Sequence, residues 1–246
     1  MGTLINAALI LLGGVLGLIF KKAVSKDMEQ SVHKATGVAV LVIGICGILS
    51  AMLKVNMDSS SGETVWKLSS SGELLLVVSL TLGTFMGEWL KLEERLNKGC
   101  KWIEDKCKMS NFATGFITST MIYCVGAMAI VGSINDGLLG DSSTLITKGI
   151  LDGVTSVVLA ASLGYGVLFS AVPILIYQGG MTLLAGLLDK VLAGELLNNI
   201  CMVGYALVMC IGINFLYNGD KKIKTVNMLP ALLVPVVYAI AKKYIG

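Results

Sequence analysis

The feature that most constrains this chain is a series of long apolar runs that recurs from its first residues to its last. A helix needs about 20 predominantly apolar residues to cross a bilayer. Hydropathy windows of that length predict eight such helices, at residues 3–20, 35–53, 74–90, 112–134, 145–163, 169–188, 196–217 and 226–244. We therefore expect an all-α polytopic membrane protein, with residues 1–246 forming a single integral membrane domain.

Composition supports this class and excludes several others. Only 14% of the 246 residues are charged, against about 25% in soluble domains, and the mean hydropathy is +0.81. The net charge of +3 comes without a basic stripe, so no nucleic-acid partner is expected. The chain has no Walker loop, GxSxG elbow, HExxH motif or cysteine ligand set, and no cofactor or metal is expected. A membrane enzyme is the least favoured class, because Asp136, Asp141 and Asp152 match no protease or phosphotransfer signature.

Lysine-rich loops set the expected orientation. They cover residues 21–34, 91–108 and 218–225, and with eight spans all three lie on one side of the membrane. The positive-inside rule then makes that side cytoplasmic and places both termini outside. The alternative is seven helices plus a re-entrant sixth segment, since Pro173, Gly179 and Gly180 interrupt that segment. It would move the last lysine group to the opposite side, so eight helices are favoured.

Two connecting segments have distinct patterns. Residues 90–108 mix apolar and charged residues, which is typical of an amphipathic helix lying on the cytoplasmic membrane surface. Residues 55–72 are polar and rich in serine and glycine, so we expect an exposed, mobile loop outside the membrane. Cys100 and Cys107 share the lysine-rich loop, and a disulfide between them is not expected in the cytoplasm.

An internal repeat is visible in the glycines. The first and third spans each carry a GxxxG pair, which lets helix backbones approach closely in lipid and could also join protomers into a homo-oligomer. The second and fourth spans both open with Ala-Thr-Gly and carry a cysteine at the same later offset. Repeat-like helix pairs are therefore predicted at 3–53 and 74–134, with a weaker, inverted copy at 169–217. The glycines predicted to pack helices are Gly13, Gly17, Gly83 and Gly87.

The fifth span contains the best candidate site. Lys148 and Asp152 stand one helical turn apart on one face. Charges at bilayer depth are costly and are kept where they pair or line water. Two interpretations stay open: a ligand- or ion-coupling site, and a structural ion pair near the outer interface. Glu88 is a second candidate carboxylate, near the cytoplasmic end of its span.

Further polar residues surround this candidate in the sequence. Asn135, Asp136 and Asp141 join the fourth and fifth spans, and Asp141 or Ser142 is placed to cap the helix that follows. Within other spans, Asn6, Gln178, Asn198, Asn199 and Asn214 could form hydrogen bonds between helices.

Four stretches resemble the YqgA/YdfK-like family of bacterial membrane proteins, a family designated domain of unknown function 554. They are GTLINAALILLGGVLG, GEWLKLEERLNKG, CVGAMAIVGSINDGLLGDSSTLITKGILDG and SAVPILIYQGG, and the likeness covers essentially the whole chain. The resemblance implies a multi-pass protein of the bacterial cytoplasmic membrane with a role in transport. It implies no substrate and no catalytic residues.

Two hypotheses for function follow. The first is a small-solute or ion transporter or channel without an ATPase domain, in which Lys148, Asp152 and Glu88 contact the solute or its coupling ion. The alternative is a structural or regulatory membrane protein, which oligomerises through its GxxxG helices or docks a cytoplasmic partner on residues 90–108. The lipid bilayer is the partner common to both.

Overall fold

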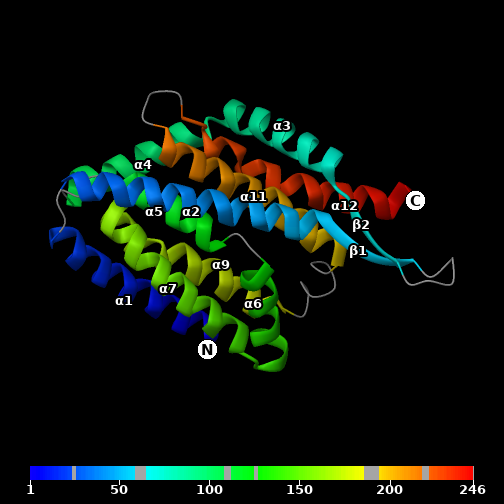
Figure 1. Ribbon diagram of the computed structural model, residues 1–246, viewed down its shortest axis with the longest axis horizontal. Coiled ribbons are helices and arrows are strands. Elements are labelled where there is room, and N and C mark those ends of the chain that lie inside the picture. Colours follow the sequence, from blue (N-terminus) through cyan, green and yellow to red (C-terminus); the bar gives the residue numbers. More distant parts are fainter. Residues whose placement is uncertain are drawn as a thin grey trace.

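The computed structural model describes residues 1–23, 26–58, 65–107, 112–124, 127–185, 194–217 and 222–245, and it is a bundle of helices with one β-hairpin (Figure 1). The first half contains α1 (Gly2–Ala23), α2 (Lys26–Met52), β1 (Leu53–Asp58), β2 (Val65–Ser70), α3 (Glu73–Leu90), α4 (Leu92–Cys107), α5 (Phe112–Cys124) and α6 (Ala127–Leu139). The second half contains α7 (Ser143–Leu163), α8 (Gly166–Phe169), α9 (Ala171–Leu183), α11 (Gly194–Leu216), the 3₁₀ helix η1 (Thr225–Leu233) and α12 (Val234–Ile245).

The all-α membrane class is confirmed. Within the described residues, 6 segments are long and apolar enough to cross a bilayer, and the bent pair α5–α6 would make 7. The apolar part of α2, Gly37–Met52, is shorter than the rest, so the count of eight stays a prediction. The doubtful sixth segment, Gly166–Leu183, is among the 6 and has the length of a full crossing. Pro173 lies in the first turn of α9, where a helix tolerates proline.

Two predicted spans are less regular than expected. The fourth is divided into α5 and α6, whose axes differ by 62°. The eighth starts as the 3₁₀ helix η1 and becomes α-helical only at Val234. Pro230 lies inside η1, and because proline has no backbone N–H, it removes a hydrogen bond that a regular α-helix would need.

The expectation of a mobile loop at residues 55–72 was wrong for most of that segment. Residues 53–58 and 65–70 form an antiparallel hairpin, in which Leu53 pairs with Ser70 and Asp58 with Val65. Valine and tryptophan in these stretches favour strands, and this preference outweighed the polar composition. Residues 59–64 lie outside the described part of the chain.

Glycines set the closest helix contacts. A Cβ on Gly13 would lie 2.0 Å from the carbonyl oxygen of Gly153, so α1 touches the backbone of α7. A Cβ on Gly87 would lie 1.8 Å from the carbonyl oxygen of Asn227, so α3 touches η1 in the same way. Gly17 and Gly83 make comparable contacts with these same partners. The two GxxxG pairs thus have equivalent roles in packing, although the sequence repeat itself stays a prediction.

The outer surface of the bundle is strongly apolar. Large side chains on α1 and α3 point outward, including Leu12, Phe20, Leu74, Phe85 and Trp89, each more than half exposed. Soluble proteins rarely expose continuous apolar surfaces of this kind, whereas a lipid-facing surface requires them. This surface supports the membrane location independently of hydropathy.

The lysine-rich segments gather at one end of the bundle (Figure 1). The end of α1, the start of α2, α4 and the start of η1 meet there, away from the hairpin and the C-terminus. The predicted amphipathic helix is present as α4, and Asn227 of η1 accepts a hydrogen bond from the Glu93 amide in its first turn, at 2.7 Å. Lys108 and Lys221 lie outside the described residues.

Candidate functional site

A buried ion pair lies in the middle of α7. The ammonium of Lys148 bonds to a carboxylate oxygen of Asp152, and the two side chains are only 7% and 12% exposed. A salt bridge between i and i+4 on a helix surface contributes little. Here both charges are removed from water, which makes the pair the strongest electrostatic feature of the interior.

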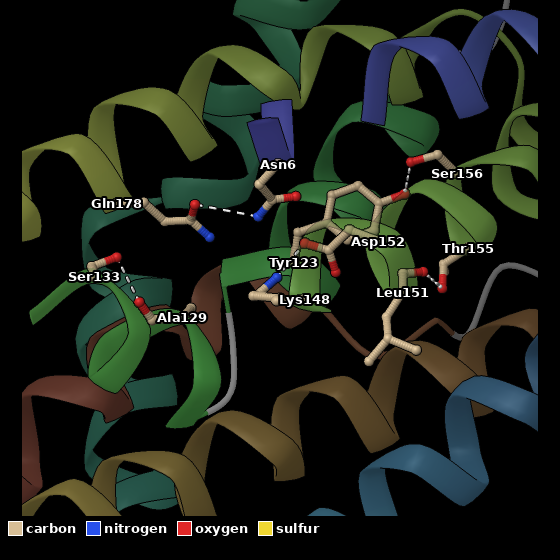
Figure 2. Close-up of polar contacts among 10 residues, drawn as sticks. All are labelled: Asn6, Tyr123, Ala129, Ser133, Lys148, Leu151, Asp152, Thr155, Ser156 and Gln178. Atoms are coloured by element: carbon tan, nitrogen blue, oxygen red, sulfur yellow. Dashed lines mark hydrogen bonds and ion pairs between the residues drawn. The ribbon is translucent and has the colours of Figure 1, made fainter. Parts of the chain in front are cut away.

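Polar side chains from four helices surround the pair (Figure 2). Asn6 of α1 donates a hydrogen bond from its amide nitrogen to Gln178 of α9 at 3.2 Å. The Tyr123 hydroxyl of α5 is 2.6 Å from that of Ser156, one turn beyond Asp152 on α7. The centre of the Tyr123 ring lies 6.0 Å from the Lys148 ammonium, close enough for a weak cation–π attraction.

Two atoms of this cluster lack partners among the described residues. Asn6 Oδ1 and Gln178 Nε2 make no hydrogen bond there, although both side chains are fully buried. Buried polar groups are nearly always bonded, because each unmet group costs about 1–3 kcal/mol. The cluster therefore has one unused acceptor and one unused donor beside the ion pair.

Glycines in the KGILDG stretch of α7 explain how closely α1 approaches the ion pair. A Cβ on Gly149 would lie 2.9 Å from the Cα of Asn6, and a Cβ on Gly153 would lie 3.1 Å from the carbonyl oxygen of Leu9. Each glycine is next to one of the charged residues in sequence. The same six-residue segment thus supplies both charges and the space that admits Asn6.

The other predicted site residues do not join this cluster. Asp136 bonds to the Ser142 hydroxyl and, at 3.2 Å, to the N-terminal amine, at the far end of α6. Asp141 accepts the Ser143 amide at 3.0 Å, which is the predicted capping role. Its bonds to Ser143 hold the pKa of Asp141 below the usual value. Asn135, half-buried, is close to Asp136 on α6.

Glu88 lies at the lysine-rich end, apart from the ion pair on α7. It pairs with Lys224 at 2.9 Å, and both side chains are about half exposed. The bond to Glu88 raises the pKa of Lys224. The sequence had indicated Asn6 and Gln178 only as groups for interhelical bonding, and nothing in the pattern had singled out Tyr123.

Two cavities lie along α5. The first, which we call the vestibule, has a volume of about 680 Å³ at the lysine-rich end, and its polar lining includes Glu93, Asn97, Thr118, Asn214 and Lys222. The second, which we call the chamber, has a volume of about 270 Å³ and an almost wholly apolar lining that includes Phe116, Met121, Ile130, Tyr177 and Leu229. Ile117 and Val226 line both, so the two cavities adjoin.

Glu93, on the vestibule wall, provides a test of whether its carboxyl is partly buried there. Partial burial is the main cause that raises the pKa of its carboxyl, and one of its oxygens has no partner among the described residues. Because the pKa of this carboxyl is higher in the folded state, the folded protein holds the proton more tightly than the unfolded chain does. The free energy of unfolding therefore falls as pH rises from the unfolded-state pKa to the folded-state pKa.

We expect Glu93→Gln to melt at a higher temperature than the wild type at pH 7.5, because the glutamine carries no charge that burial penalises. Below about pH 4, where the wild-type carboxyl is protonated in both states, the two melting temperatures should coincide. Melting curves from about pH 3 to pH 8 measure this. A Glu93→Gln protein that is less stable at pH 7.5 would show that the carboxylate is paired rather than desolvated.

Comparison with known proteins places the chain in a family. Residues 1–240 match the model described as "Protein of unknown function (DUF554)". The chain belongs to the DUF554 family. It is 34% identical over 234 residues to the uncharacterized membrane protein YdfK of Bacillus subtilis, covering 95% of this chain and 93% of YdfK. It is 28% identical over 240 residues to the uncharacterized protein YqgA of Escherichia coli, with the same coverage. No solved structure matches the chain.

Proposed function

We propose that this DUF554 protein transports a small solute or ion across the bacterial cytoplasmic membrane, with Lys148 and Asp152 as its binding and coupling site. The main observation behind this proposal is a row of two adjoining cavities. It leads from the lysine-rich end toward a buried ion pair, beside which two polar atoms have no hydrogen-bond partner among the described residues. No ATP-binding motif is present in the sequence, so an ion gradient would supply the energy.

The energetics of the ion pair support a functional role. A buried pair is often no more stable than an apolar replacement of the same size, because desolvation offsets the attraction. Within a membrane the penalty for each charge is several kcal/mol. Lys148 and Asp152 are therefore poor choices for stability alone, and a site whose charges exchange partners during transport accounts for them.

Orientation follows from the grouped lysines. Under the positive-inside rule the lysine-rich end faces the cytoplasm, and both termini lie outside. The vestibule then opens toward the cytoplasm, while the N-terminal amine and its partner Asp136 lie near the outer surface. This arrangement corresponds to a transporter whose inner access path is formed.

A ligand screen tests the proposal. The full chain, purified in detergent, is heated with amino acids, organic acids, nucleobases and metal ions, alongside Asp152→Asn. A ligand that binds only the folded state stabilises it and so raises the melting temperature. At a ligand concentration of 100 times the dissociation constant, the stabilisation is about 2.7 kcal/mol. We expect at least one class to stabilise the wild type and not Asp152→Asn.

The matched control is Glu195→Gln. It removes a carboxylate whose pairing with Lys242 is exposed, and it should leave every ligand response unchanged. A complete absence of ligand responses, with Asp152→Asn melting like the wild type, would refute the proposed site.

One observation favours the alternative role. Helix α4 presents Trp102, 62% exposed, with the Lys106 ammonium 4.7 Å from the centre of its ring. Such an exposed aromatic and lysine pair suits a membrane surface or a docked protein. A partner that copurifies with the wild type and is lost when Lys101 and Lys106 are changed to glutamine would support regulation instead of transport.

A further inference from the structure

The chamber and the ion pair share a wall, and that wall is built from consecutive residues. On α5, Tyr123 belongs to the polar cluster while Cys124 lines the chamber. On α9, Gln178 belongs to the cluster while Tyr177 lines the chamber. The apolar chamber and the polar cluster therefore contact adjacent faces of α5 and α9. A ligand that fills the chamber and also contacts the ion pair would need an apolar part and a charged part.

Lys148 faces α5, the helix that also lines the chamber. Its ammonium lies 6.0 Å from the ring centre of Tyr123, the residue that directly precedes Cys124 on the chamber wall. This cation would attract the anionic group of a ligand that lies in the chamber along α5. The unused donor, Gln178 Nε2, suits an anionic oxygen as well.

An inorganic cation fits this site less well. Among the described residues, no group of three acidic, histidine or cysteine side chains could hold a metal ion. A bare ion would also gain nothing from an apolar space of about 270 Å³. A small organic molecule gains about 0.8 kcal/mol for each CH₂ group that it buries there.

We propose that the chamber holds the apolar body of a small carboxylate, whose carboxylate group replaces Asp152 as the partner of Lys148 while Asp152 takes up one proton. This inference rests on the proposed transport function and names the substrate class of its site. The charges balance: Lys148 stays positive, the ligand carboxylate takes over the negative charge, and Asp152 becomes neutral. One carboxylate and one proton are thus taken up together, with no net charge added.

The surroundings leave Asp152 as the group that takes up the proton. On its own helix the facing charge is Lys148, and α5 contributes the titratable side chains Tyr123 and Cys124. Helices α8 and α9 carry no charged residue, and the charges of α1 and α2 are confined to residues 21–22 and 26–34, at the lysine-rich end. On α6 the only charged residue is Asp136, which is bonded to the N-terminal amine.

Binding to the purified full chain tests this, with straight-chain carboxylates from acetate to hexanoate as probes. Binding is measured rather than flux, because neutral acids cross bilayers without a transporter. We expect affinity to rise up to about fourfold for each added CH₂ until the chamber is filled. Because one proton is taken up with each carboxylate, affinity should also rise about tenfold for each unit that pH falls between 8 and 6. Alkylamines of the same lengths, and sodium chloride at equal ionic strength, should have no such effect.

Two variants locate the binding. Thr120 lines the chamber, and Thr120→Phe should abolish the response to hexanoate, whereas Thr81→Phe on the exposed face of α3 should not. The double variant Lys148→Met/Asp152→Leu removes both charges without leaving either unpaired, so it should fold and still fail to bind. A hexanoate response that survives in Thr120→Phe and in the double variant would show partition into detergent and overturn the inference.

Other outcomes separate this inference from the proposed function. Stabilisation by amines or inorganic cations that depends on Asp152, without any by carboxylates, would overturn the carboxylate assignment and leave a transport site at Lys148 and Asp152. No response to any ligand class, in wild type or variants, would overturn both.

Discussion

Asp152→Leu is expected to lower the free energy of unfolding by about 3–5 kcal/mol, because it leaves the buried Lys148 ammonium without its partner. The double variant Lys148→Met/Asp152→Leu should recover most of that loss, since neither charge then remains in the apolar interior. Reversible unfolding in mixed detergent and SDS, followed by tryptophan fluorescence, measures both. This is among the largest effects expected from any single side chain of the protein.

An exposed ion pair serves as the control for this prediction. Lys242 and Glu195 lie 3.1 Å apart with side chains 59% and 58% exposed. Glu195→Leu should therefore change stability by no more than about 1 kcal/mol. If the double variant at Lys148 and Asp152 is as unstable as Asp152→Leu alone, then the pair itself stabilises the fold, and the argument that it is kept for function fails.

Gly13→Leu and Gly87→Leu should prevent normal folding or reduce stability by more than about 3 kcal/mol. In both cases the new Cβ would meet a backbone carbonyl oxygen, at 2.0 Å from Gly153 and 1.8 Å from Asn227. Overpacking against side chains typically costs about 1–3 kcal/mol, and a backbone atom on a packed helix has less freedom to move. The yield of monodisperse protein and its SDS unfolding midpoint provide the measurement.

Gly99 serves as the matched control because a Cβ at that position meets nothing within 4 Å. Gly99→Leu should fold normally, and Gly99→Ala should stabilise α4 by up to about 1 kcal/mol through helix propensity. Normal folding of Gly13→Leu would mean that α1 and α7 are not held together at this contact.

Sequence patterns were sufficient for the features that depend on local chemistry. The lengths of the apolar runs determine the membrane class, and the spacing of Lys148 and Asp152 placed them on one helix face. The hairpin at residues 53–58 and 65–70 was missed, because polar composition was weighed above strand preference. The division of the fourth span into α5 and α6 was also missed.

The partners of the candidate site could not be read from spacing, because they come from distant parts of the chain. Asn6 and Gln178 are 172 positions apart, and Tyr123 is 33 positions from Ser156. Only the packing of α1 and α5 on α7, and of α9 on α1 and α5, brings them together. Conversely, Glu88 and Asp136 looked like members of the same site by residue type. The fold separates them and gives each its own partner, Lys224 for Glu88 and the N-terminal amine for Asp136.

The partners of the glycine contacts bear on how the protein is made. Helices α1 and α3 emerge early from the ribosome, yet their glycine faces fit α7 and η1, and α2 fits α11. Until those later segments are inserted, three early helices would have narrow, grooved faces turned toward lipid. Assembly can be complete only after η1, Thr225–Leu233, has been synthesised, so a nascent chain that lacks it should be a target for membrane quality-control proteases.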